Sequence, residues 1–221
     1  MSAAALPRIH LVRHGETEWS LSGQHTSRTD IPLISRGEEQ ARRLGDLLRG
    51  IEFFRIFTSP LQRARRTCEL AGFLARMEID PDLSEWNYGQ YEGITAADIC
   101  KLRPGWNVFR HGCPGGESPA EVSGRADRVA ARLRDVAGNV AVFSHGHFLR
   151  ALAARWVGLP VSEGQHLLLN TASLSILGFE HNHADEPAIA LWNAGLTLVH
   201  QIASVAGQIG SSGGAKESSP G

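Results

Sequence analysis

Three short motifs in the chain bring arginine and histidine together in a pattern that could bind a phosphoryl group. Arg13-His14-Gly15 and Ser144-His145-Gly146 each follow a short apolar run, and Arg63 comes a few residues after a third such run. The planar guanidinium of arginine fits phosphoryl oxygens in bidentate fashion, and the open N–H groups of a helix N-terminus add partial positive charge. Two arginines and two histidines in one pocket would therefore hold a phosphate.

Buried strands are predicted directly before these motifs. Apolar runs of strand length cover Ile9 to Val12, Ile56 to Thr58 and Val140 to Phe143. Two later runs, Leu174 to Phe179 and Ala188 to Trp192, flank a polar turn at His181 to Glu186. This second group is expected to form an antiparallel pair at a sheet edge.

Helices are predicted between the strands. The spacing of a capping box occurs at Ser35 with Glu38, at Ser59 with Gln62 and at Ser118 with Glu121. Arg63 would then lie in the first turn of its helix. A further helix is expected to follow His147 and to run through Arg155.

Strands that alternate with helices indicate an α/β fold, which we expect to be a three-layer α/β/α sandwich with a mainly parallel sheet and an antiparallel edge. Sheets of this kind bind ligands outside the carboxyl ends of their strands. Arg13, His14, Arg63 and His145 all follow predicted strands, so they are expected to face one pocket.

Length and composition limit the other possibilities. The 221 residues, 42% of them hydrophobic, suffice for one domain, which we place at residues 1–205; the Gly/Ser-rich residues 206–221 are expected to form a disordered tail. With 22 Lys and Arg against 23 Asp and Glu, the chain has no overall field that would attract nucleic acid or an anionic membrane. Its three cysteines form no CxxC pair, and no apolar run approaches the roughly 18 residues of a membrane span. We therefore expect a cytoplasmic protein that binds neither nucleic acid nor membrane.

Four motifs resemble those of a known family. Leu11 to Trp19, with the sequence LVRHGETEW, is similar to the signature of the histidine phosphatase superfamily, in its phosphoglycerate-mutase-like branch. Ser59 to Ala64 resembles the family's second arginine motif, Leu83 to Gly89 its acidic motif, and Ser144 to Gly146 its second histidine motif. Within the superfamily the chain most resembles sedoheptulose-bisphosphatase-type and related acid phosphatases.

The resemblance implies a role for each motif residue. His14 would be the nucleophile that becomes phosphorylated, Arg13, Arg63 and His145 would bind the equatorial oxygens, and Glu85 would be the proton donor. These roles agree with the needs of phosphoryl transfer, which are an in-line nucleophile, fixed positive charge and an acid for the leaving alkoxide. No metal or other cofactor is required.

Five further residues are predicted to bind the rest of the substrate, namely His25, Thr26, Trp86, Tyr88 and Arg150. Trp86 and Tyr88 flank Glu85, where aromatic side chains would shape a sugar pocket, although aromatic residues also serve as core. Arg150 would hold a second phosphate or lie on a solvated helix face. We therefore expect a metal-independent phosphatase that hydrolyses small phosphorylated metabolites, such as sugar phosphates or bisphosphates, through a phosphohistidine.

Three alternative functions remain open. A phosphoglycerate mutase is disfavoured because Ser20 stands where cofactor-dependent mutases carry asparagine, and because the segment from Glu85 to Glu117 lacks their paired arginines. A metallohydrolase would use the His-x-His spacing at His145 and His147, which His181 and His183 repeat. A phosphate-binding protein without turnover would not need Glu85, which this chain retains. The oligomeric state stays undetermined.

Overall fold

A six-stranded sheet lies at the centre of the protein in the computed structural model, which describes residues 6–195. Its strands are β1 (Arg8–Arg13), β2 (Phe53–Thr58), β3 (Met77–Ile79), β4 (Asn139–Ser144), β5 (Leu174–Phe179) and β6 (Pro187–Ala194), in the spatial order β3-β2-β4-β1-β5-β6. The pairs among the first four strands are parallel, whereas β5 and β6 run antiparallel at one edge. The predicted α/β fold with a mainly parallel sheet is confirmed.

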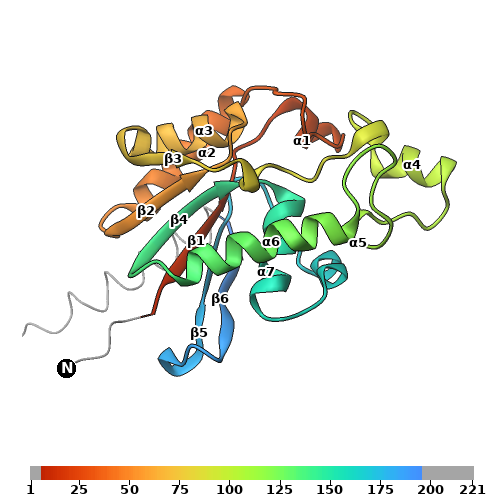
Figure 1. Ribbon diagram of the computed structural model, residues 1–221. Coiled ribbons are helices and arrows are strands. Elements are labelled where there is room, and N and C mark those ends of the chain that lie inside the picture. Colours follow the sequence, from red (N-terminus) through yellow and green to blue (C-terminus); the bar gives the residue numbers. More distant parts are fainter. Residues whose placement is uncertain (1–5, 196–221) are drawn as a thin grey trace, which may run out of the picture.

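Helices cover both faces of the sheet (Figure 1). On one face lie α2 (Ser35–Leu48) and α3 (Gln62–Cys68), and on the other lie α6 (Pro119–Arg134) and α7 (Gly146–Trp156). Shorter helices occur in the connections, namely α1 (Glu18–Ser22), α4 (Ala96–Leu102) and α5 (Val108–His111). Short stretches of 3-10 or π helix span Glu69–Phe73, Leu74–Arg76, Pro81–Leu83, Gly89–Tyr91, Val161–His166 and Glu180–Asn182.

The side chains of the central strands alternate between two hydrophobic cores. In β4, Val140 and Val142 pack toward α6 and α7, whereas Ala141 and Phe143 pack toward α2 and α3. This alternation is the period of a strand, and burial on both faces explains why β4 is an unbroken apolar run. The sheet is therefore held rigidly between helices, and its strand ends are fixed points for a site.

One of the three predicted capping boxes is present. At α6, Ser118 accepts a hydrogen bond from the N–H of Glu121, and the Glu121 carboxylate accepts one from the N–H of Ser118. The capping boxes predicted at Ser35 and Ser59 are wrong, because α2 and α3 begin without a side-chain cap. The Ser59 hydroxyl contacts His145 instead, and the Oδ1 atom of Asp30 accepts the N–H of Gln62 at the start of α3.

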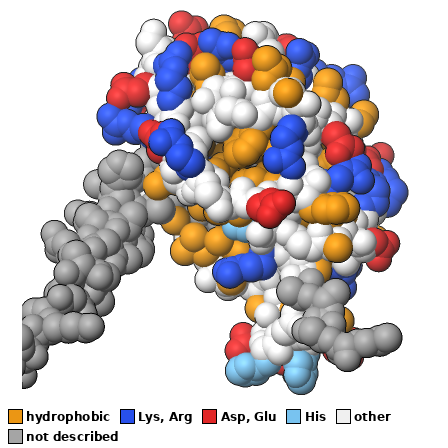
Figure 2. Space-filling model, turned by 90° about the vertical axis from the view of Figure 1, so that its left-hand side faces the viewer, with side chains coloured by type: hydrophobic (Ala, Val, Ile, Leu, Met, Phe, Trp, Pro, Cys, Tyr) orange, Lys and Arg blue, Asp and Glu red, His pale blue; other side chains and the backbone are white. Residues whose placement is uncertain are grey.

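Three further expectations concern the tail of the chain, membrane-spanning helices and the charge on the surface. The boundary predicted at residue 205 and the tail predicted at 206–221 lie outside the described residues. None of the helices described in residues 6–195 is long and apolar enough to cross a membrane. Basic and acidic side chains are interspersed on the face of the molecule drawn in Figure 2, as the near balance of charges in the sequence predicts.

Candidate active site

A cavity of about 160 Å³ lies at the carboxyl ends of β1 and β4. Its lining residues come from four parts of the chain and are Arg13, His14, Thr17, Trp19, Ser20, Gly23, Gln24, His25, Thr26, Glu85, Tyr88, Gly146, His147, Arg150 and Leu169. The position agrees with the general rule that α/β sheets bind ligands beyond the carboxyl ends of their strands. Of the five predicted catalytic residues, Arg13, His14 and Glu85 line this cavity, whereas Arg63 and His145 do not.

His14 is oriented by its own neighbour. Its Nδ1 atom lies 2.7 Å from the carbonyl oxygen of Gly15, and because a carbonyl only accepts, the ring proton is on Nδ1. The lone pair is then on Nε2. Burial, followed by the positive charges of Arg63 and Arg13, holds the pKa of His14 well below its ordinary value of 6.5. His14 is therefore a neutral imidazole with a free nitrogen at neutral pH.

The loop of His14 depends on close contact between two glycines. A Cβ atom on Gly15 would lie 2.3 Å from the carbonyl oxygen of Gly37 in α2, which is closer than any real contact. Gly15 also donates its N–H to Oγ1 of Thr67 in α3, at 3.1 Å. Helices α2 and α3 thus fix the nucleophile from one face of the sheet.

Three cationic or polar side chains near His14 have nitrogen atoms that no residue satisfies. Among the described residues, Nε of Arg13, Nε of Arg63 and Nδ1 of His145 are buried and have no hydrogen-bond partner. Other nitrogens of the two arginines are held in place: Nη1 of Arg13 donates to the carbonyl of Leu169 at 2.5 Å, and Nη2 of Arg63 donates to the carbonyls of Thr26 and Ser27 at 3.1 and 3.2 Å. Buried unpaired donors are costly, so these atoms indicate a site for an acceptor-rich anion.

His145 lies beside His14, with ring centroids 5.1 Å apart. Its Nε2 atom is 2.7 Å from Oγ of Ser59, which also accepts the N–H of Leu61 at 3.3 Å. The Ser59 hydroxyl can donate its proton to Nε2, and in that tautomer the ring proton is on Nδ1. Burial, then the charge of Arg63, lowers the pKa of His145 well below 6.5. His145 is thus a neutral ring at neutral pH, and in this tautomer it offers an N–H donor beside His14.

The Glu85 carboxyl is fixed against the first turn of α7. Its Oε1 atom accepts the N–H groups of Trp86 and Phe148 at 2.9 and 2.8 Å, and Oε2 accepts that of His147 at 3.0 Å. The first N–H groups of a helix have no partner within the helix, and the oxygens of a carboxyl group can accept them. Glu85 is therefore held by three hydrogen bonds while it still faces the cavity that His14 lines.

The residues predicted to bind the rest of the substrate fall into two groups. His25, Thr26, Tyr88 and Arg150 line the cavity. Trp86 does not, because its ring is fully buried in the core against Phe109 and its Nε1 atom donates to the carbonyl of Glu117 at 2.9 Å. Only the backbone N–H of Trp86 serves the site, through Glu85.

Away from Arg13 and His14, the wall of the cavity combines neutral polar rings with one cation, Arg150. Nδ1 of His25 donates to the carbonyl of Ile94 at 2.7 Å, and burial lowers the pKa of His25, so its Nε2 is an acceptor at neutral pH. The hydroxyl of Tyr88 lies 2.5 Å from Nδ1 of His147. Arg150 donates to the carbonyls of Gly164 and Gln165, and burial lowers its pKa to about 10, which still leaves it charged at pH 7.

Several residues of the site were not predicted. The cavity-lining ones are Thr17, Trp19, Ser20, Gly23, Gln24, Gly146, His147 and Leu169. Ser59 orients His145, and Arg125 binds the backbone of Glu85 from outside the cavity. Arg125 had a signal in the sequence, because it is a charge among the apolar residues Val122, Ala126 and Val129 of one helix face.

The two His-x-His pairs do not point to a shared metal ion. His145 contacts Ser59 and His147 contacts Tyr88, so the two rings face different partners. Since Leu177 of β5 pairs with Ile9 of β1, the β5–β6 turn that carries His181 and His183 lies at the opposite end of the sheet from His14. Figure 2 shows histidine side chains projecting at this end of the molecule. In residues 6–195, no group of three His, Cys, Asp or Glu side chains is placed to hold a metal ion.

Comparison with known proteins agrees with this geometry. The chain is 45% identical to an acid phosphatase of Mycobacterium tuberculosis, over 79% of this chain and 87% of the relative. It is 34% identical to sedoheptulose 1,7-bisphosphatase of Saccharomyces cerevisiae, over 84% of this chain and 92% of the relative. The solved structure of the product of an open reading frame of Mycobacterium tuberculosis matches with a TM-score of 0.80 and 41% identity, covering 86% of this chain and 98% of that one. Residues 9–195 match the histidine phosphatase superfamily (branch 1), and the chain belongs to this family.

Proposed function

We propose that the chain is a metal-independent phosphatase that hydrolyses small phosphorylated metabolites through a phosphohistidine on His14. The observation that carries the proposal is the set of buried, unpaired donors on Arg13, Arg63 and His145 around a neutral His14. A phosphoryl group supplies the oxygens that these donors lack. In a buried site such fixed donors act strongly on charge that shifts during phosphoryl transfer.

The first step transfers the phosphoryl group to the enzyme. The lone pair on Nε2 of His14 attacks phosphorus, a P–N bond forms, and the bond to the ester oxygen breaks with its electron pair on that oxygen. The carboxyl of Glu85 gives its proton to this oxygen, and the product leaves as an alcohol. Nδ1 of His14 keeps its proton and its hydrogen bond to Gly15, which stabilises the charge on the phosphorylated ring.

The second step releases phosphate. Glu85, now a carboxylate, takes a proton from water as the water oxygen attacks phosphorus. The P–N bond breaks, its electron pair returns to Nε2 of His14, and inorganic phosphate departs. General acid–base catalysis of this kind typically contributes about 10²–10⁴-fold.

The wall of the cavity supports a sugar phosphate or bisphosphate as substrate. His25, Thr26 and Gln24 present neutral polar groups beside Tyr88, as a polyol needs. Arg150 adds a positive charge whose hydrogen bonds go to backbone carbonyls rather than to a carboxylate. A second phosphate would be stabilised there, in agreement with the bisphosphatase among the relatives.

A screen of phosphorylated metabolites tests the proposal. Purified protein is incubated with sugar monophosphates, sugar bisphosphates and 3-phosphoglycerate in the presence of a chelator, and released phosphate is measured. We expect release that survives chelation and is inhibited by vanadate, which imitates five-coordinate phosphorus. Loss on chelation with rescue by zinc would favour a metallohydrolase. Isomerisation of 3-phosphoglycerate with little release would favour a mutase, and no turnover of any compound would favour a binding protein.

A further inference from the structure

We infer that Arg125 is a positioning residue for the Glu85 carboxyl, acting from the side of the segment that faces away from the cavity. The inference rests on the proposed function, because it assigns Arg125 a part in proton transfer to the leaving group. Arg125 lies on α6, is buried, and does not line the cavity that contains His14. Since it does not line the cavity, its effect on proton transfer passes through the position of Glu85.

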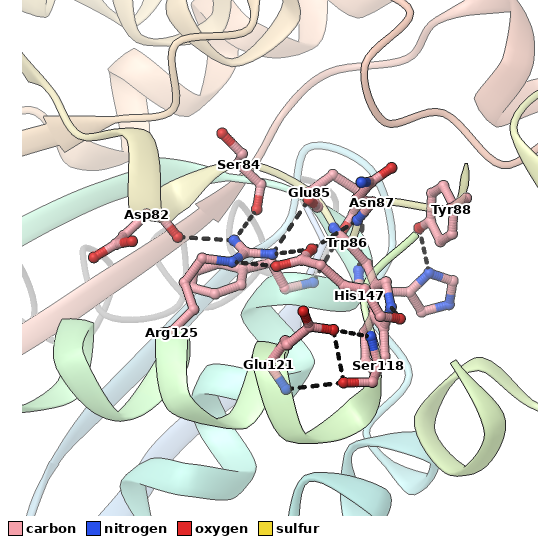
Figure 3. A network of polar contacts seen from close by, with 12 residues as sticks. Asp82, Ser84, Glu85, Trp86, Asn87, Tyr88, Ser118, Glu121, Arg125 and His147 are labelled. Carbon is pink, nitrogen blue, oxygen red and sulfur yellow. Dashed lines mark hydrogen bonds and ion pairs between the residues drawn. The ribbon is translucent and has the colours of Figure 1, made fainter. Parts of the chain in front are cut away.

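The first contact is with the backbone that carries Glu85 (Figure 3). Nη1 of Arg125 donates to the carbonyls of Asp82 and Ser84 at 2.9 and 2.5 Å, and Nη2 donates to the carbonyl of Glu85 at 3.3 Å. These three carbonyls belong to four consecutive residues of the connection after β3. One guanidinium thus determines the path of the chain up to the acid.

The second contact is with the helix that binds the carboxyl. The guanidinium carbon of Arg125 lies 4.3 Å from the centroid of the Phe148 ring, within the range of a cation–π interaction. Phe148 is the residue whose N–H donates to Oε1 of Glu85 at 2.8 Å. Arg125 therefore contacts both parts of the structure that orient Glu85, namely its own backbone and the first turn of α7.

Glu117 holds Arg125 in this orientation. Its Oε1 accepts from Nε of Arg125 at 2.9 Å and its Oε2 accepts from Nη2 at 2.8 Å, which is a bidentate pair. Oε2 of Glu117 also accepts the N–H of Asn87, and the Glu117 carbonyl accepts Nε1 of Trp86. The residues on both sides of Glu85 are thus tied to one ion pair. Since Glu117 neutralises the charge of Arg125, the pair acts on Glu85 through geometry.

A small displacement of Glu85 would be costly for the reaction. A misplacement of about 1 Å can lower a rate by roughly 10². Lysine at position 125 would keep the charge but could not bind three carbonyls and a carboxylate at once. The substitution should slow the step in which Glu85 gives its proton. The loss of rate should be large only for esters whose leaving group needs a proton.

The experiment compares two esters in single-turnover phosphorylation of the full-length chain. Glycerol 2-phosphate has a poor alkoxide leaving group, whereas p-nitrophenyl phosphate has one that needs little protonation. We expect Arg125→Lys to slow phosphorylation by glycerol 2-phosphate about 10–10²-fold and by p-nitrophenyl phosphate less than about threefold. The matched control is Arg128→Lys, one turn further along α6, because Arg128 is exposed and contacts only the Asp82 carboxylate. It should change neither rate.

A double-mutant cycle separates positioning from general loosening. In a Glu85→Gln background, which has no acid to position, Arg125→Lys should have no further effect on glycerol 2-phosphate. If Arg125→Lys does not fold, as judged by its melting temperature, Glu117→Gln serves as the second variant, because it breaks the same bidentate pair from the other side.

Two results would overturn the inference: equal losses for both esters, or unchanged rates in Arg125→Lys and Glu117→Gln. Either result leaves the proposed function intact, since the wild-type chain would still turn over both esters. Failure of the wild-type chain to release phosphate from these two esters and from every compound of the metabolite screen would instead refute the proposed function itself.

Discussion

Gly146 lies directly against the guanidinium of Arg13, so that a Cβ atom at position 146 would be 3.1 Å from Cζ of the arginine. This contact gives a physical reason for the glycine after His145. Arg13 is also held by the carbonyl of Leu169, which accepts a hydrogen bond from its Nη1 atom. The two residues after β4 therefore have different roles: His145 places its ring beside His14, and Gly146, which has no side chain, leaves space for the guanidinium of Arg13.

Gly146→Ala should lower activity without lowering stability. The added methyl group would displace the Arg13 guanidinium, whereas alanine has a higher helix propensity than glycine. We expect kcat/KM for a sugar phosphate to fall about tenfold, with a melting temperature equal to or above that of the wild type. Gly124→Ala in α6 is the control, because its Cβ meets no atom within 4 Å; it should keep full activity. A Gly146→Ala protein with full activity would show that Arg13 tolerates the displacement.

Glu85→Gln should separate the two kinds of ester. Glutamine keeps the shape of the side chain but cannot give a proton, so phosphorylation of His14 by a sugar phosphate should slow by roughly 10²–10⁴. With p-nitrophenyl phosphate the loss should be much smaller, and substrate binding should barely change. Pre-steady-state release of nitrophenol isolates this step from the later attack of water. Equal losses for both substrates would mean that another group protonates the leaving oxygen.

Arg150→Gln should affect a bisphosphate more than a monophosphate. A charge-assisted hydrogen bond is worth about 1.5–3 kcal/mol, so losing it should raise KM for a sugar bisphosphate roughly tenfold or more while KM for the matching monophosphate changes little. Arg155→Gln, on the same helix but paired with Asp127, is the control. A similar rise for both substrates would show that the contacts of Arg150 with Gly164, Gln165 and Phe109 are structural.

Stability should decrease as the pH falls below about 6.5. His14 and His145 have folded-state pKa values well below 6.5, so the unfolded chain binds their protons first. Between its pKa in the folded chain and its pKa in the unfolded chain, each histidine lowers the free energy of unfolding by up to about 1.4 kcal/mol for every pH unit that the pH falls. Urea denaturation in phosphate-free buffer from pH 7.5 to 5.5 measures this slope. His145→Asn should make this slope shallower, because it removes one of the two groups. A flat profile for the wild type would contradict the assignment of neutral histidines.

Most of the fold could be predicted because β1, β2, β4 and β5 are apolar runs whose positions match the strands of the sheet. β3 was missed, since its three residues are partly or fully exposed and carry no pattern of their own. It exists because the edge of β2 offers backbone groups to pair with. Helices α1, α4 and α5 are also too short to show a helical period.

The site could be predicted in part because the carboxyl ends of parallel strands lie together at one edge of the sheet. This arrangement brings Arg13, His14 and His145 together, but it does not tell which way a loop residue points. Trp86 and Tyr88 are two positions apart, yet the first is core and the second lines the cavity. Ser59 likewise has the sequence pattern of a helix cap, and only the approach of His145 from β4 gives its hydroxyl a different partner.

The most direct test of the proposed mechanism is the detection of the phosphorylated enzyme. The protein is exposed briefly to labelled substrate, quenched, denatured, and mapped by mass spectrometry under alkaline conditions. We expect one phosphate on His14 that is lost in acid and stable in base, and we expect His14→Ala to show neither adduct nor turnover. Ordinary activity in His14→Ala, or an adduct on a different residue, would contradict His14 as the nucleophile.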